Sequence, residues 1–350
     1  MRKFLPLLAG LALFLAACGA PRNAAMPSPA AAVYVFNAGN DSVSVVNPAA
    51  GAVAKTVVIG TTSRYPSATW GASSGYVLLP HAGNLAVLRL SGLQVTDNLP
   101  LPDPHGVNST ETPDGRTAIL ALPDEEQLLY LNLDHRRGYV GQELGSQATG
   151  KMGPAGISTD PRGGYVLVPG NFNGKNCVID LAKLTQSATI CTVGSPVPHP
   201  TLGSVSPDGR WWAVANAGSP GSITLYDVAK PRHVVQVGLV SPIQGLGAGP
   251  YFPIFTPHSR YLLALQQGSD SIAVIDPATL QVVRTIHLPG ADPVYAAYSP
   301  GGRHLYVAMA KSNAVAVLEV PQLQVRGLIG VGPDPVSVVA GSYRFLPPAG

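Results

Sequence analysis

From residue 33 onward the chain is built from short apolar runs separated by clusters of turn residues. Runs such as Trp211–Asn216, 261–265 and 304–308 are rich in β-branched and aromatic side chains and span only five or six residues. Gly, Pro, Asn, Asp and Ser gather between the runs. Short β-branched runs bounded by such residues are typical of strands, so the pattern predicts an all-β protein.

One turn recurs along the chain and sets the period of the pattern. Thr112-Pro113-Asp114-Gly115-Arg116 reappears as Ser206-Pro207-Asp208-Gly209-Arg210. Proline presets φ at the second turn position, and glycine tolerates the positive φ that a tight reversal can require. Looser copies begin at Thr159, Thr256 and Ser299. Successive prolines of this turn lie 50 and 43 residues apart (207 to 257 and 257 to 300), a period typical of propeller blades.

The repeating unit contains four strands, and the chain holds seven such units. After each turn come a strand, a polar hairpin, two further strands, and a glycine and proline that lead into the innermost strand of the next unit. Because the chain begins at a second strand and ends on a first strand, the final strand is expected to complete the N-terminal blade and close a ring. Closure removes the sheet edges that otherwise promote aggregation. A two-sheet sandwich is the alternative, but it does not explain so regular a repeat. The expected innermost strands lie near Pro66, Pro104, Pro154, Pro200, Pro250, Pro293 and Pro335.

Two stretches carry a resemblance to a known repeat. Tyr34-Val35-Phe36-Asn37 matches three of the four letters of the YVTN motif, and residues 269–299 match the wider unit, with a valine-rich strand ending in Asp276-Pro277. The chain therefore resembles the YVTN-type β-propeller family over residues 32–345, clearly in the first and last units and loosely in the middle. The resemblance implies a seven-bladed propeller of four-stranded antiparallel blades. It identifies an architecture and leaves the function open.

Composition narrows the class of protein further. The 39 glycines and 34 prolines occur together with 46% hydrophobic residues, so the chain has enough apolar surface to fold and many tight turns. Charged residues make up only 12%, and the formal net charge is +3. A nucleic-acid-binding protein would carry a dense basic patch, so we expect no nucleic-acid partner.

The N-terminus has the layout of an export signal. Arg2 and Lys3 precede an uncharged apolar stretch, residues 4–15, which is too short to span a bilayer. The stretch leads into Leu15-Ala16-Ala17-Cys18, which resembles the lipobox of bacterial lipoproteins. That resemblance implies a signal peptide at 1–17, a lipid on Cys18 as the membrane anchor, and a tether at 18–31. We expect a protein held outside the cytoplasm, and Gly19 favours the outer membrane or cell surface. An ordinary secretory signal is the alternative.

Cys177 and Cys191 remain once Cys18 is assigned to the lipid. Aligning Ile179-Asp180 with Ile275-Asp276 places the two cysteines opposite each other across one antiparallel hairpin. Directly opposed residues in such a pair are within bridging distance, and an exported protein meets an oxidising compartment. The sequence therefore predicts a disulfide inside one blade.

Candidate chemistry gathers on one face of the expected ring. In a propeller, the loops that lead into the innermost strands and the hairpins between second and third strands lie together around the channel mouth, and long loops on a rigid scaffold commonly carry binding residues. Asp before Pro is also ordinary turn chemistry. The candidate ligand-binding residues are Arg64, Tyr65, Asp103, His105, His199, Tyr251, Asp292 and Asp334.

No motif identifies a reaction or a cofactor. Gly71-Ala72-Ser73-Ser74-Gly75 matches the nucleophile elbow of serine hydrolases, but it occupies a turn between two strands and no helix follows. Haem, zinc and EF-hand motifs are not found, so we expect no cofactor and no metal and assign no catalytic residue.

The expected function is therefore non-enzymatic. An envelope-anchored propeller would bind a protein, a peptide or a surface polymer through the loops around its channel. The alternative is a lactonase-like hydrolase, because similar seven-bladed rings include sugar-lactone hydrolases with polar residues at the channel mouth. In that case His105 or His199 would be the candidate general base.

Overall fold

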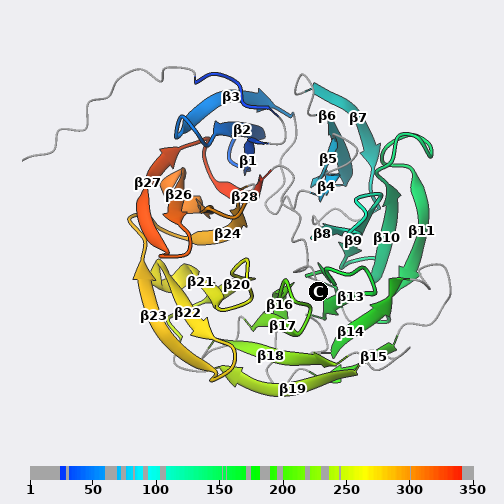
Figure 1. Cartoon of the computed structure of the whole chain (residues 1–350). Helices are drawn as coiled ribbons and strands as arrows, with labels where there is room; N and C mark the ends of the chain where they lie inside the picture. The colour runs from blue at the N-terminus through cyan, green and yellow to red at the C-terminus, as the bar shows by residue number, and fades with distance from the viewer. Residues whose placement is uncertain are drawn as a thin grey trace, which may run out of the picture.

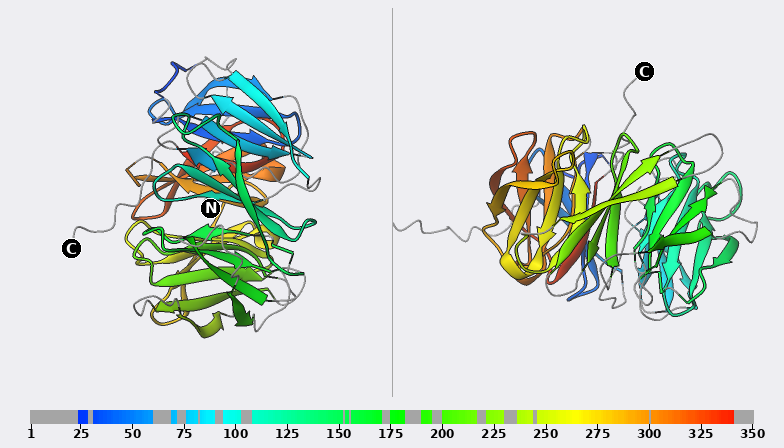
Figure 2. Two further views of the ribbon diagram at one scale, coloured as in Figure 1. Left: turned by 90° about the vertical axis from the view of Figure 1, so that its right-hand side faces the viewer. Right: turned by 90° about the horizontal axis from the view of Figure 1, so that it is seen from below.

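The computed structural model is a ring of seven four-stranded sheets arranged around a central channel (Figure 1). Figure 2 shows the same ring from its edge. The structure describes residues 24–28, 31–59, 69–71, 76–81, 83–89, 94–102, 108–151, 153–154, 156–170, 175–181, 190–194, 200–216, 221–229, 236–243, 246–299 and 301–340. None of these described residues forms a helix with the length and hydropathy needed to cross a membrane.

Each sheet is one blade, and its four strands are antiparallel neighbours from the channel outward. Blade 1 contains β28 (Pro335–Ala340), β1 (Val33–Asn37), β2 (Ser42–Asn47) and β3 (Ala52–Val58); blade 2 contains β4 (Thr69–Gly71), β5 (Tyr76–His81), β6 (Asn84–Arg89) and β7 (Gln94–Pro100); blade 3 contains β8 (Ser109–Glu111), β9 (Thr117–Leu122), β10 (Gln127–Asn132) and β11 (Glu143–Ala148). Blade 4 contains β12 (Ser158–Thr159), β13 (Tyr165–Pro169), β14 (Lys175–Asp180) and β15 (Ile190–Gly194); blade 5 contains β16 (Pro200–Val205), β17 (Trp211–Asn216), β18 (Ser222–Ala229) and β19 (Gln236–Ile243). Blade 6 contains β20 (Pro250–Phe255), β21 (Leu262–Gln266), β22 (Ser271–Asp276) and β23 (Gln281–His287); blade 7 contains β24 (Pro293–Tyr298), β25 (His304–Met309), β26 (Ala314–Glu319) and β27 (Gln324–Gly330). Two short 3-10 turns, η3 (Gln267–Ser269) and η4 (Ala310–Ser312), lie in the hairpins of blades 6 and 7.

The ring closes by pairing the last strand with the first. β28 runs antiparallel to β1, with Val33 opposite Ala340 and Val35 opposite Val338. The C-terminal strand therefore becomes the innermost strand of the N-terminal blade, which confirms the closure predicted from the sequence.

The apolar core lies between the faces of neighbouring blades. Second and third strands such as β17 and β22 are buried along nearly their whole length, whereas the outer strand β23 is mostly exposed. Trp212 is fully buried and stacks on Tyr226 with ring centroids 5.0 Å apart. Because both faces of a blade are covered, the middle strands are continuous apolar runs without alternation.

The ring has two faces with different loops. We call the face with the Pro-containing turns between first and second strands, and the hairpins between third and fourth strands, the turn face. The opposite face, with the hairpins between second and third strands and the crossing loops between blades, is the mouth face. On the turn face, Gly115 N–H donates to Thr112 O at 2.7 Å and Gly209 N–H to Ser206 O at 2.8 Å. The repeated turn predicted from the sequence thus has the same geometry in blades 3 and 5.

Blade 3 departs from the repeat because its outer hairpin is longer. The buried amide of Asn132 donates to the carbonyl oxygens of Asp134 and Tyr139, both at 3.1 Å, and holds this loop closed. Asp134 is also buried and accepts a hydrogen bond from Arg136 Nε at 3.0 Å. That hydrogen bond lowers the pKa of Asp134 below its ordinary value.

The cysteine register agrees with the sequence analysis. In the β14–β15 pair Cys177 lies opposite Cys191, next to an irregularity between Asn176 and Cys177. Cys177 is fully buried and is disulfide-bonded. The bridge to Cys191 itself stays a prediction.

Candidate functional site

Three of the eight candidate residues fall within the described part of the chain. Tyr251, Asp292 and Asp334 are described, and all three lie at the mouth face, where crossing loops lead into β20, β24 and β28. The other candidates, together with Ser73 and the expected lipid site, lie outside the described residues: Arg64, Tyr65, Asp103, His105, His199 and Cys18.

The two described aspartates occupy left-handed backbone positions. Asp292 has a φ of 66° and Asp334 a φ of 51°, and each directly precedes the proline that begins an innermost strand. Asn and Asp tolerate this region better than most residues because their short polar side chains can hydrogen-bond locally. The backbone at these two positions therefore already favours an aspartate, whether or not a ligand binds.

Hydrogen bonds tie each crossing loop to the hairpin of the blade it leaves. Asp292 N–H donates to Asp270 Oδ1 at 2.8 Å, and Asp334 N–H donates to Asn313 Oδ1 at 3.0 Å. Blade 3 repeats the arrangement, with Lys151 N–H donating to Glu126 Oε2 at 3.1 Å. We call this contact the crossing-loop staple.

The same loops also bind the blade that they lead into. The carbonyl oxygen of Asp292 accepts the N–H of Ala310 at 2.9 Å, and that of Asp334 accepts the N–H of Ala38 at 2.8 Å. Each aspartate thus connects two blades through its backbone. The side chain of Asp292 is only 17% exposed, and its Oδ2 lies 3.5 Å from Nζ of Lys311, whose side chain is well exposed. Because Lys311 is solvated, this ion pair contributes little to stability.

Aromatic side chains form the channel wall below these loops in blades 6 and 7. Tyr251 is half-buried at an irregularity of β20, where Pro250 pairs with Gln266 but Phe252 pairs with Leu265. Phe252 stacks on Tyr295 of β24 with centroids 4.2 Å apart. Burial raises the pKa of Tyr295 to about 12, so its hydroxyl stays protonated at neutral pH and is able to donate a hydrogen bond.

The sequence analysis missed Tyr295, although a signal was present. Tyr251 follows Pro250 directly, and Tyr295 lies two positions after Pro293 at the start of the next innermost strand. Both tyrosines pack against the small apolar cluster around Val294. Comparing the innermost strands with each other would have placed the two side chains near one another.

The other half of the channel wall is more polar. Glu111 of β8 is the one charged residue in the seven innermost strands, and it is half-buried. Beside it, the hydroxyls of Thr110 and Thr159 lie 2.9 Å apart across the boundary between blades 3 and 4. Glu111 ends its strand at the turn face, whereas Tyr251 begins its strand at the mouth face. The two side chains therefore lie at opposite ends of the channel and cannot act on the same reacting atom.

Two further observations concern metal sites and pockets in the described part of the chain. No three His, Cys, Asp or Glu side chains among the described residues come together in a way that could hold a metal ion.

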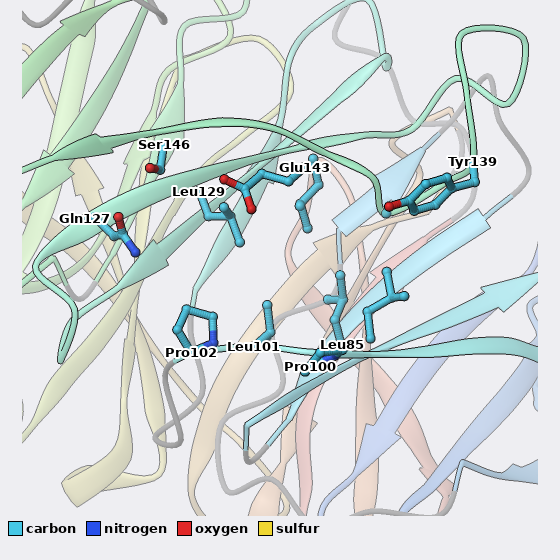
Figure 3. A pocket seen from close by; sticks show the side chains of 12 residues that line it. Leu85, Pro100, Leu101, Pro102, Gln127, Leu129, Tyr139, Glu143 and Ser146 are labelled. Carbon is cyan, nitrogen blue, oxygen red and sulfur yellow. The ribbon is translucent and has the colours of Figure 1, made fainter.

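A pocket does occur between blades 2 and 3, away from the channel (Figure 3). Its walls are mostly leucine and proline, and the polar side chains are Gln127, Tyr139, Glu143 and Ser146.

Comparison with known proteins bears on the function. No curated protein matches the chain. The family model "Lactonase, 7-bladed beta-propeller" matches residues 178–329, which span β14 to β27. Among solved structures, the periplasmic gluconolactonase PpgL of Pseudomonas aeruginosa has a TM-score of 0.70 at 17% identity, covering 88% of this chain and 98% of that one. A putative 6-phosphogluconolactonase from Bacteroides uniformis has the same TM-score and coverage at 15% identity. A functionally unknown protein from Desulfotomaculum acetoxidans has a TM-score of 0.72 at 13% identity, with the same coverage.

The fold is therefore an all-β propeller with four-stranded antiparallel blades, and its second half matches a lactonase family model. At such low identity the solved structures show the fold alone. The YVTN repeat and the lipoprotein character stay predictions from the sequence.

The expectation of a non-enzymatic binding protein is wrong on these findings. The family match and the two gluconolactonase-type structures favour the lactonase-like alternative. That expectation depended on polar loops around the channel. Polar loop residues do not distinguish a binding surface from an enzyme, because Asp292 and Asp334 also have a structural role in the crossing loops.

Proposed function

We propose that the protein is a hydrolase that opens a lactone at the mouth face of its channel. The observation that carries the proposal is the match of the lactonase family model to residues 178–329. The matched region includes all of blades 5 and 6 and nearly all of blade 7, with Tyr251, Asp292 and Tyr295 among its residues. Solved structures named as gluconolactonase and 6-phosphogluconolactonase share the architecture and support the same reading.

The reaction has simple requirements. The oxygen of a water molecule bonds to the carbonyl carbon while a base accepts its proton, and the ring C–O bond breaks as the leaving oxygen takes up a proton. The product is a hydroxy acid, which ionises at neutral pH and releases one proton per lactone opened. Catalysis therefore needs a general base and hydrogen-bond donors at the carbonyl oxygen.

The sequence and the described part of the mouth face together offer residue types for these roles. His105 and His199 are the candidate bases, because unperturbed histidine titrates near neutral pH. The Tyr295 hydroxyl, which is protonated at neutral pH as is any tyrosine with a pKa of about 10 or above, is a candidate donor to the carbonyl oxygen. Tyr251 and Tyr295, which are half-buried, supply apolar faces for the ring carbons, and the buried ring of Phe252 supports Tyr295 by stacking on it.

The test is proton release on lactone opening by the purified protein. With glucono-1,5-lactone as the probe in a pH-stat, we expect a rate clearly above spontaneous hydrolysis. His105→Ala or His199→Ala, whichever removes the base, should lower kcat by about 10²–10⁴-fold. The matched control is Lys55→Gln, which changes an exposed residue of the outer strand β3 and should leave the rate unchanged.

The result that overturns the proposal is equally definite. If a panel of five- and six-membered lactones is opened no faster with the protein than in buffer, the proposed activity is wrong. If activity is present but both histidine variants keep it fully, the reaction stands and the base lies elsewhere on the mouth face.

We further propose that the protein is anchored to the cell envelope through a lipid on Cys18, after removal of residues 1–17. The support is the charge, apolar length and cysteine position of the N-terminus. Mass spectrometry of the detergent-extracted protein should show an N-terminal Cys18 carrying acyl groups. Cys18→Ser should give an unacylated chain, and an unmodified Cys18 in the wild type would contradict the anchor.

A further inference from the structure

We propose that the turn face binds the anionic headgroups of a phospholipid surface. The starting observation is an arginine in the turn between the first and second strands of blades 3 to 7. All five are exposed. These residues, here called the arginine ring, are Arg116, Arg162, Arg210, Arg260 and Arg303.

On this face the arginines are more exposed than most of the acidic residues. Arg116 and Arg210 have side chains that are 49% and 60% exposed, whereas the side chain of Asp134, beside Arg116, is 7% exposed. The turn aspartates Asp114 and Asp208 are exposed, but their carboxylates accept backbone N–H groups of Arg116 and Arg210 at 3.1 and 3.0 Å. Asp160, Asp180, Asp276 and Glu319, at the turns and third-strand ends, are buried or half-buried. Asp227 has a side chain that is 41% exposed and lies 3.6 Å from Arg210, and Glu143 at the start of β11 is exposed.

The outermost charges on the turn face are therefore mainly guanidinium groups. Arginine presents a planar set of donors that fits phosphate oxygens in pairs. Two members of the arginine ring rest against aromatic rings: Arg210 lies over Trp211 at 4.3 Å and Arg260 over Tyr261 at 5.2 Å. Such contacts hold the guanidinium in place; Arg210 also lies 3.6 Å from Asp227 Oδ2.

The long hairpin of blade 3 adds residues of the same kind. Arg136 and Arg137 are exposed next to Tyr139, whose side chain is 62% exposed. A tyrosine with an apolar ring and a polar tip is suited to the boundary between lipid and water. The charges and the aromatic group thus belong to one side of the molecule.

The path of the chain identifies the occupant as a membrane. β1 begins at the turn face, and at the same face Asn47 Nδ2 donates a hydrogen bond to the carbonyl oxygen of Ala25 at 2.8 Å. Ala25 lies seven positions after Cys18, a span of at most about 25 Å when the chain is fully extended. If the proposed anchor on Cys18 is present, the turn face is held close to the bilayer and the mouth face is directed away from it.

The experiment uses vesicles and a chain without the anchor. The protein beginning at residue 19 is suitable, because all 28 strands lie between residues 33 and 340 and close the ring without the N-terminal segment. It is sedimented with vesicles containing 30% phosphatidylglycerol in phosphatidylcholine, or phosphatidylcholine alone, over a range of salt concentrations. We expect binding to the anionic vesicles only, weakening as salt rises.

Charge removal from the arginine ring provides the specific test. Arg162→Gln, Arg260→Gln and Arg303→Gln together should weaken binding to anionic vesicles about 100-fold, since each basic residue near such a surface contributes roughly fivefold. The matched control removes three exposed charges away from the turn face: Lys55→Gln in β3, and Lys151→Gln and Lys311→Gln on the mouth face. The control should bind within about twofold of the wild type if position rather than net charge matters. Circular dichroism confirms that both triple variants are folded.

Several results would overturn the proposal. An equal loss of vesicle affinity in the two triple variants would mean that net charge, and not the position of the arginines, determines binding. Binding of the wild type to neutral vesicles as tight as to anionic vesicles would mean that the arginines do not contact anionic headgroups. Retention on a resin that carries a polyanion, without any vesicle binding, would identify an anionic polymer as the partner instead. Lactone hydrolysis does not enter this assay, so its outcome is separate from that of the proposed activity.

Discussion

At Asp270 the backbone has a φ of 48° and the side chain accepts the N–H of Asp292, so one residue provides both a sharp turn and a staple. Asn313 does the same in the next blade, with a φ of 49°. Few residue types tolerate this backbone region and also offer an acceptor at short range. The identity of these residues is thus determined by local geometry on the mouth face.

The staple predicts a specific response at Asp270. Asp270→Ala removes the acceptor and places alanine in the left-handed region, so we expect a loss of about 1–2 kcal/mol in stability. Asp270→Asn keeps both the acceptor and the tolerance for this backbone and should be nearly neutral. Hydrogen exchange of the Asp292 amide, whose partner is Asp270 Oδ1, should become faster in the alanine variant only. Equal protection in both variants would show that the staple does not hold the loop.

A second residue-scale prediction concerns close approach in the crossing loop before β28. A Cβ on Gly332 would lie 2.6 Å from Asn37 Nδ2 and 2.7 Å from Asn37 Cγ, and Asn37 is buried and hydrogen-bonded to Ser42 and Ser44. Gly332→Ala should therefore destabilise the protein by about 1–3 kcal/mol.

The control for this variant is a glycine with open space around it. A Cβ on Gly327 of β27 meets nothing within 4 Å, so Gly327→Ala should be neutral or slightly stabilising because it reduces the freedom of the unfolded chain. Denaturant midpoints of the two variants make the comparison. Equal midpoints would contradict the steric argument.

The sequence could identify the loop residues but not their roles. Asp292 and Asp334 precede prolines and were correctly expected near the start of innermost strands, yet their backbone contacts with the neighbouring blades depend on groups about 20 residues earlier and on the following blade. Such contacts depend on how neighbouring blades are placed in space, and a local sequence pattern does not contain that information. Tyr295 escaped notice for the same reason, because its stacking partner Phe252 belongs to another blade.

At the scale of the element, the hairpin of β14 and β15 offers the clearest test. Cys177 lies opposite Cys191 and is fully buried. We predict a Cys177–Cys191 bridge that closes a short loop and stabilises the blade by about 2–3 kcal/mol. Intact mass with and without reductant, followed by alkylation of the native protein, measures it. Two alkylatable thiols in the oxidised native protein would rule the bridge out, and Cys177→Ser with Cys191→Ser gives the reduced reference.

Strands and turns were largely predictable because their causes are local. Alternation of apolar runs with Pro-Asp-Gly turns gives the strands, and the opposed cysteines follow from aligning one hairpin with another. The irregularity at Tyr251 could not be predicted, since it depends on how Pro250 and Phe252 pair with β21. The longer hairpin of blade 3 appeared in the sequence only as a departure from the repeat.

At the scale of the whole molecule, buried tyrosines couple stability to alkaline pH. Burial raises the pKa of Tyr34 and Tyr306 to about 12 and also raises that of Tyr130 and Tyr165. Unfolded tyrosine titrates near 10. Between pH 10 and 12 the unfolded chain therefore loses protons that the folded ring keeps, and stability falls as pH rises.

The size of this effect can be stated for each side chain. Every fully buried tyrosine lowers the free energy of unfolding by about 1.4 kcal/mol per pH unit above 10. We expect cooperative unfolding at high pH, with tyrosinate absorbance appearing together with loss of circular dichroism. Tyr306→Phe should move the transition to higher pH. Tyrosinate absorbance that develops well before unfolding would show that these hydroxyls are accessible in the folded ring.

Closure of the ring determines whether seven blades behave as one body. A chain ending at residue 334 lacks β28, which leaves the inner edge of β1 unpaired and exposes the buried side chains of Val33 and Val35. An unpaired apolar edge promotes association with other chains. A chain ending at residue 340 retains β28 and serves as the control. We expect the longer chain to be monodisperse on gel filtration with a single cooperative thermal transition, and the shorter chain to aggregate or unfold at much lower temperature. If both chains unfold at the same temperature, the blades are stable independently, and the pairing of β1 with β28 is not what maintains the channel on which the proposed site depends.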